Sequence, residues 1–94
     1  MENRISLYAA QYGKCAVTEK LLMPYDIRCH HKIPLKYGGT DDYDNLVLVT
    51  ETVHILIHST SKPTIDGYMK LLNLNKKQLA KLNKLRKLAG TEML

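Results

Sequence analysis

The chain has 94 residues and a formal net charge of +5 at pH 7. A chain of this length supports one hydrophobic core, so we expect a single domain over residues 1–94. With 45% hydrophobic and 24% charged residues, the composition excludes a disordered chain and is typical of a folded domain. The positive charge favours an acidic partner such as nucleic acid, although many basic proteins bind none.

The composition also disfavours a membrane protein and a cysteine-based metal site. No apolar run approaches the roughly 20 residues that span a bilayer. The N-terminus lacks the long apolar region and cleavage site of a signal peptide, so we expect a cytoplasmic protein with no membrane partner. The two cysteines, Cys15 and Cys29, do not belong to a C-x2-C pair and cannot make a zinc site by themselves.

An N-terminal helix is predicted over residues 5–12, because apolar residues recur there at helical spacing and fall on one face: Ile5, Tyr8, Ala9 and Tyr12. Gly13 should end this helix. Residues 15–22, which lie between Gly13 and Pro24, predict a turn or a small hairpin.

Two short strands are predicted on either side of a polar loop. Residues 26–31 alternate between apolar and polar, and this strand should end near Ile33 because Pro34 cannot continue a ladder. A loop rich in glycine and aspartate follows over residues 35–44. Residues 45–49 then form a second, apolar strand, which we expect to pair antiparallel with the first.

Three helices are predicted in the rest of the chain. Thr50 caps a helix over residues 51–58, whose buried face consists of Val53, Leu56 and Ile57. A second helix begins around Pro63 and should direct four apolar residues inward: Ile65, Tyr68, Met69 and Leu72. Asn75 and Gln78 resemble a capping box that opens a last helix over residues 76–89, ending at Gly90.

The last predicted helix is strongly basic, and two interpretations of it remain open. Its cations alternate with leucines: Lys76, Lys77, Lys81, Lys84, Arg86 and Lys87. They either form a solvated surface above a leucine-rich buried face or bind the phosphates of nucleic acid. In the second interpretation Lys32 and Lys36, close to a histidine pair in the sequence, contact nucleic acid as well.

All four histidines of the chain lie between Cys29 and Ser59, as an adjacent pair and as an H-x3-H pair on the predicted helix: His30, His31, His54 and His58. His54 and His58 are one helical turn apart and can hold a metal ion together. A third ligand must come from His30 or His31. Both reach one site only if the chain bends after the strand, which Pro34 favours.

A metal ion and a general base together suit the hydrolysis of a phosphodiester bond. A neutral imidazole with a pKa of about 6.5 can accept a proton from water at neutral pH. A divalent ion can stabilise the negative charge on the phosphoryl and leaving oxygens. Asn45, between the two histidine pairs, can hydrogen-bond the backbone across the loop and fix the angle of the base; alternatively, it is an ordinary turn asparagine.

The motifs H-H-x-I-P, Gly-Gly, N-L-V-x-V and H-x3-H resemble the HNH endonucleases, and the spacing is similar to that of the colicin-type DNases. The resemblance implies an α+β fold with a ββα-metal (His-Me finger) core over about residues 26–60 and a helical extension over about residues 61–90. It also implies roles for the site residues, with one divalent ion held by His30, His54 and His58. His31 is then the general base that activates water, and Asn45 orients it.

Three longer runs resemble the C-terminal endonuclease domain of bacterial group II intron-encoded reverse transcriptases, or maturases: R-I-S-L-Y-A-A-Q-Y-G-K-C-A-V-T, G-G-T-D-D-Y-D-N-L-V-L-V and L-N-K-L-R-K-L-A-G. This resemblance implies that the domain nicks one strand of double-stranded DNA. It also implies intron RNA and upstream reverse transcriptase domains as partners, with Met1 as the start of a fragment. Two alternatives are a catalytically silent, metal-containing DNA-binding module and a stand-alone HNH nuclease, toxin-like or phage-borne.

One departure from that family concerns a structural zinc ion. Many members carry two C-x2-C pairs, but here the corresponding positions are Cys15 with Thr18 and Thr50 with Val53. We therefore expect no structural zinc, with Val53 packing in its place. For the catalytic ion, three imidazoles favour Zn²⁺ or Ni²⁺ binding, whereas we expect Mg²⁺ or Mn²⁺ to support cleavage.

Overall fold

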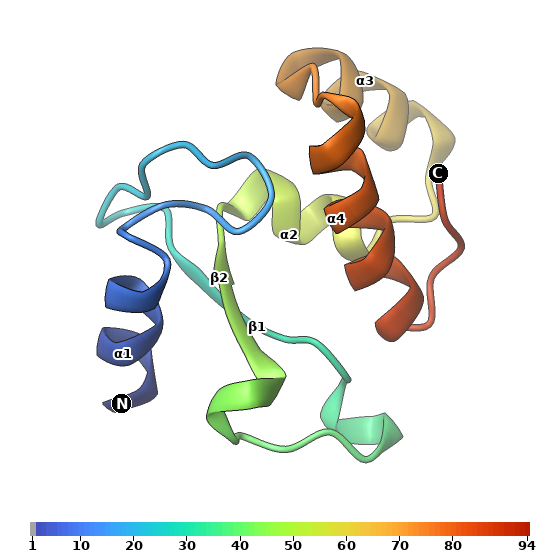
Figure 1. Ribbon diagram of the computed structural model, residues 1–94. Coiled ribbons are helices and arrows are strands. Elements are labelled where there is room, and N and C mark those ends of the chain that lie inside the picture. Colours follow the sequence, from blue (N-terminus) through green and yellow to red (C-terminus); the bar gives the residue numbers. More distant parts are fainter. Residues whose placement is uncertain (1) are drawn as a thin grey trace.

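The computed structural model of the protein describes residues 2–94, so Met1, the first residue of the predicted domain, lies outside the described part. These residues form a two-stranded antiparallel sheet, four α-helices and two short 3₁₀ helices, η1 (Leu35–Tyr37) and η2 (Tyr43–Asn45) (Figure 1). The predicted α+β fold is confirmed. None of the described helices is both long enough and apolar enough to cross a membrane.

The centre of the fold is a ββα unit made of β1 (Arg28–His31), β2 (Leu46–Val49) and α2 (Glu51–His58). The strands pair as predicted, with Arg28 opposite Val49 and His31 opposite Leu46. Helix α2 has the predicted bounds, because Thr50 caps it by accepting a hydrogen bond from the backbone N–H of Val53 at 3.3 Å. Its predicted inner face is fully buried.

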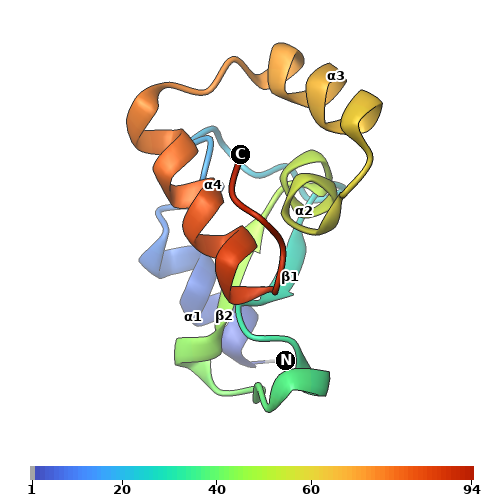
Figure 2. The ribbon, with the colours of Figure 1, turned by 90° about the vertical axis from the view of Figure 1, so that its right-hand side faces the viewer.

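The sheet lies between α1 (Glu2–Ala10) and α4 (Lys76–Leu88), as both views show (Figures 1 and 2). Helix α1 contacts β2, whereas α2 contacts β1, α3 (Lys62–Leu72) and α4. The core is made of apolar side chains from both strands, from the segment around residues 15–22, and from α1, α2 and α4. The bridge between Lys14 and Leu21 confirms the small hairpin predicted in that segment.

The apolar face of α1 that the sequence indicated does not pack against the core. Ile5 is 77% exposed and Tyr12 83% exposed, and Tyr8 and Ala9 are also exposed, whereas Leu7 is buried. The orientation of the helix is explained by Gln11, whose side chain accepts a hydrogen bond from the N–H of Leu48 and donates one to its carbonyl, both at 3.0 Å. This polar pairing to the edge of β2 turns Leu7 toward the core.

The two C-terminal helices agree with the prediction in their positions and their caps. Asn75 and Gln78 form the capping box at the start of α4, and Gly90 follows its end with a left-handed φ of 88°. Leu82 and Leu85 are buried, and α4 packs against α2. The predicted inner residues of α3 are partly buried against the same core.

Arg86 is buried within the fold, so its predicted role as a nucleic-acid contact was wrong. The side chain is 2% exposed, and its guanidinium donates hydrogen bonds to the carbonyls of Leu56, of Ser59 at 3.0 Å and of Glu92 at 2.6 Å. Leu56 lies in the last turn of α2, where the carbonyls have no partner within the helix. Arg86 therefore joins α4 to the end of α2 and to the C-terminal tail.

We predict that Arg86→Met lowers the free energy of unfolding by about 3 kcal/mol, because it leaves buried carbonyls without a donor. Urea denaturation followed by circular dichroism measures this change. Lys87→Met is the matched control, since Lys87 is exposed and next in the sequence. Equal unfolding free energies for the two variants would contradict the structural role of Arg86.

Candidate active site

Three histidines from two elements converge on one point of the ββα unit. His30 comes from β1, and His54 and His58 come from successive turns of α2. One ring nitrogen of each lies within 4.8 Å of those of the other two. The ring centroids are 5.2 Å apart for both pairs that include His30 and 5.0 Å apart for His54 and His58. His30, rather than His31, is therefore the third residue of the cluster.

The environment keeps these three rings neutral. Burial, as the largest cause, and the neighbouring His54 and His58 together lower the pKa of His30 to about 3. Burial is also the main cause of the lowered pKa values of His54 and His58, with Lys36 adding to the effect at His58. Neutral imidazoles are the form that binds metal ions.

One ring nitrogen of the cluster is buried without a hydrogen-bond partner in the described part of the chain. The Nε2 atom of His30 is buried and makes no hydrogen bond with any residue of the described chain. Leaving a buried polar atom unpaired costs free energy, which a bound cation would recover. Three converging neutral imidazoles, one of which has a buried nitrogen without a hydrogen bond, fit a divalent ion with an affinity for nitrogen, such as Zn²⁺ or Ni²⁺.

The cluster opens into a surface cavity of about 410 Å³ that is also lined by His31. The other lining residues come from β1 and from the segment that follows it: Cys29, Pro34, Leu35 and Lys36. His30 is buried, whereas His31, at the end of β1, is partly exposed. The structure thus brings the two adjacent histidines to one cavity, although only His30 belongs to the cluster.

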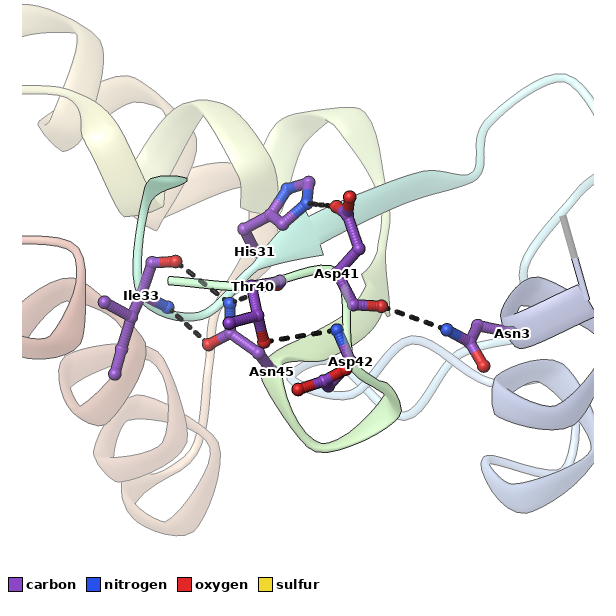
Figure 3. Close-up of polar contacts among 7 residues, drawn as sticks. All are labelled: Asn3, His31, Ile33, Thr40, Asp41, Asp42 and Asn45. Carbon is purple, nitrogen blue, oxygen red and sulfur yellow. Dashed lines mark hydrogen bonds and ion pairs between the residues drawn. The ribbon is translucent and has the colours of Figure 1, made fainter. Parts of the chain in front are cut away.

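His31 has a partner that the sequence analysis missed. Its Nε2 atom lies 2.7 Å from Oδ1 of Asp41, in the loop between the strands (Figure 3). The signal available in the sequence was the acidic pair after Gly-Gly and Thr40, but nothing there distinguishes Asp41 from Asp42.

Asn45 closes the loop between β1 and β2 through three hydrogen bonds (Figure 3). Its Oδ1 atom accepts from the N–H of Ile33 at 2.9 Å, and its Nδ2 atom donates to the carbonyls of Ile33 at 3.0 Å and Thr40 at 2.8 Å. Gly39 is required at this crossing, since a Cβ atom there would lie 1.8 Å from the Ile33 carbonyl oxygen. The prediction that Asn45 hydrogen-bonds the backbone across the loop is confirmed.

Some of the predicted nucleic-acid contacts line two cavities, and the others are exposed on α4. Lys36 lines the histidine cavity, while Lys32, Lys81 and Lys84 line a separate cavity of about 180 Å³ beside β2 and α4. The remaining lysines of α4 are exposed: Lys76, Lys77 and Lys87. Lys81 also forms an ion pair with Glu19 at 3.1 Å. Apart from Arg86, these side chains are accessible, and their contact with nucleic acid stays a prediction.

The positions compared above with the two C-x2-C pairs are Cys15, Thr18, Thr50 and Val53. Cys15 and Val53 are buried in the hydrophobic core, and Thr18 is also buried. Val53 thus packs in the core, as predicted. That the protein binds no structural zinc stays a prediction.

Comparison with known proteins identifies the segment that carries this site. The family model described as HNH endonuclease matches residues 14–59, which include both strands, α2, the four histidines and Asn45. Helices α1, α3 and α4 lie outside the match. No solved structure matches the chain.

Two curated proteins of Enterobacteria phage T4 are similar to this segment. The chain is 48% identical over 40 residues to probable mobile endonuclease B, covering 43% of this chain and 15% of that protein. It is 41% identical over 46 residues to probable mobile endonuclease D, covering 49% of this chain and 18% of that protein. The chain thus matches less than a fifth of the length of either relative. Residues 14–59 are therefore similar to HNH endonucleases, both by the family model and by the two phage relatives.

Proposed function

We propose that the protein hydrolyses phosphodiester bonds in double-stranded DNA, with His31 as the general base and with a divalent ion held by His30, His54 and His58. The observation that carries this proposal is the position of His31 on the same cavity as the three converging neutral histidines. The HNH match over the same residues supports it.

Each residue of the cavity has a separate task in this proposal. A divalent ion bound there would stabilise the negative charge that develops on the phosphate and on the leaving oxygen. His31 accepts a proton from the attacking water. Because the His31 side chain is partly exposed, water can reach it. Asn45 keeps the loop closed behind His31, and Lys36 attracts the phosphate to the edge of the cavity.

Two kinds of protein are candidates for carrying such a domain. The resemblance of three sequence runs favours a group II intron reverse transcriptase, in which the domain nicks target DNA beside intron RNA and polymerase domains. The printed names of the two phage relatives favour a phage-borne mobile endonuclease instead. Reading the full coding sequence separates these candidates. The cytoplasmic location stays a prediction in both.

We predict that His31→Ala lowers DNA cleavage by about 10²- to 10⁴-fold, because the attacking water loses its base. Supercoiled plasmid incubated with Mg²⁺, Mn²⁺, Zn²⁺ or no metal reports nicked and linear products on a gel. Metal binding by the variant should be unchanged, which controls for folding. Cleavage equal to that of the wild type would assign the base elsewhere. DNA binding without cleavage in the wild type, with every metal, would favour the silent DNA-binding module.

We predict that His54→Ala and His58→Ala each weaken Zn²⁺ or Ni²⁺ binding by at least about tenfold, since each removes one of three nitrogen ligands. Isothermal titration calorimetry measures the affinity. His31→Ala is the matched control, because it removes an imidazole from the same cavity but not from the cluster. An affinity unaffected by either helix substitution would rule out this ligand set.

We predict that the metal-free protein loses stability as the pH falls from about 7 to about 5. In the folded protein the pKa of His30 is about 3, whereas an unfolded histidine titrates at about 6.5. Between pH 6.5 and pH 3, roughly, the unfolded chain therefore binds more protons than the folded protein. The contribution of neutral His30 to folding stability is complete above the unfolded pKa and is lost as the pH falls toward the folded pKa.

The midpoint of urea unfolding in the presence of a chelator checks this pH dependence. The midpoint should be lower at about pH 5 than at about pH 7. The difference between the two midpoints should be smaller in His30→Gln, because this variant lacks the imidazole with the lowered pKa. A wild-type midpoint that is the same at both pH values would contradict the buried, neutral state of His30.

A further inference from the structure

We propose that Asp41 is a positioning residue for His31, which fixes the tautomer and the orientation of the imidazole so that Nδ1 is the nitrogen that accepts the proton. The proposal rests on the proposed function of His31 as the general base. Asp41 belongs to neither the predicted metal ligands nor the predicted catalytic residues.

The contact between the two side chains has the geometry of a strong hydrogen bond. Oδ1 of Asp41 lies 2.7 Å from Nε2 of His31, within the range of charge-assisted bonds between nitrogen and a carboxylate (Figure 3). The contact uses Nε2 and leaves Nδ1 outside it. The two ring nitrogens of His31 are therefore in different environments.

The chemistry of the two groups determines where the hydrogen lies. An ionised carboxylate can only accept hydrogen bonds, so the ring nitrogen facing Asp41 must carry the hydrogen. A neutral imidazole has a hydrogen on one nitrogen and a lone pair on the other. With the hydrogen on Nε2, the lone pair that can accept a proton from water is on Nδ1.

The backbone around Asp41 is held on both sides, which places its side chain against His31 (Figure 3). The Nδ2 atom of Asn3 donates to the Asp41 carbonyl at 3.0 Å, and Asn45 donates to the carbonyl of the preceding Thr40 at 2.8 Å. The hydroxyl of Thr40 in turn accepts from the N–H of Asp42 at 3.2 Å. Since Asn3 belongs to α1, a helix outside the HNH match helps to place this residue.

The contact has little to contribute to folding. The side chain of Asp41 is 73% exposed, and exposed ion pairs add little to stability. A role in orienting His31 therefore predicts a change in catalysis with no change in the unfolding midpoint. This difference separates a positioning residue from a structural one.

The first test compares cleavage by Asp41→Ala, Asp41→Glu and Asp42→Ala in the full chain. Asp42→Ala is the matched control, because it removes the same charge from the same loop without touching His31. Asp41→Ala should lower kcat by roughly tenfold or more with little change in KM, and Asp41→Glu should recover much of the loss because it restores an acceptor. Equal kcat values for Asp41→Ala and Asp42→Ala would overturn the proposal.

The second test reads the tautomer directly and does not depend on cleavage. Long-range ¹H–¹⁵N correlation spectra of the metal-free protein at about pH 8, where an ordinary imidazole is neutral, distinguish a hydrogen on Nε2 from one on Nδ1. The wild type should show the Nε2–H form of His31, and Asp41→Ala a mixture of both forms. A wild-type spectrum with the hydrogen on Nδ1 would overturn the proposal. A wild type with the Nε2–H form that cleaves no DNA would overturn the proposed function instead.

Discussion

The hydrogen bonds of Asn45 are the constraint on which the arrangement of the active site depends. One amide side chain ties Ile33, which follows β1, to the loop residue Thr40 and so closes the connection to β2. His31 precedes this closure and Asp41 follows it, so the same bonds determine the positions of both. A side chain that hydrogen-bonds only to backbone thus determines how the proposed catalytic residue His31 and its partner Asp41 are placed.

Features with a local signal could be predicted from the sequence. The bounds of α2 follow from its cap and its apolar spacing, and the capping box marks the start of α4. The H-x3-H spacing places His54 and His58 on one side of the helix, independently of how the rest of the chain folds. Once the strands pair antiparallel, His30 lies beside that helix and the cluster is complete. These are contacts between neighbours in the chain or across one hairpin.

Features that depend on contacts between distant residues could not be predicted. The apolar spacing of α1 indicated the wrong face, because the amide of Gln11 pairs with Leu48 on the edge of β2. Arg86 looks like any other cation of a basic helix, yet three carbonyls from two separate segments bind its guanidinium. Asp41 is one of several loop acids, and only the closed loop brings it to His31. No pattern of spacing records such pairings.

The position of Arg86 has a consequence for how the nuclease segment can move between proteins. The HNH match ends at residue 59, and the carbonyl of Ser59 is one of the groups that Arg86 binds. The helix with two of the three clustered histidines is therefore completed by a residue that the family segment does not contain. A recombination event that transfers the segment alone leaves this guanidinium behind. Residues 14–59 placed without α4 in another protein therefore need a different donor for the carbonyls at the end of α2.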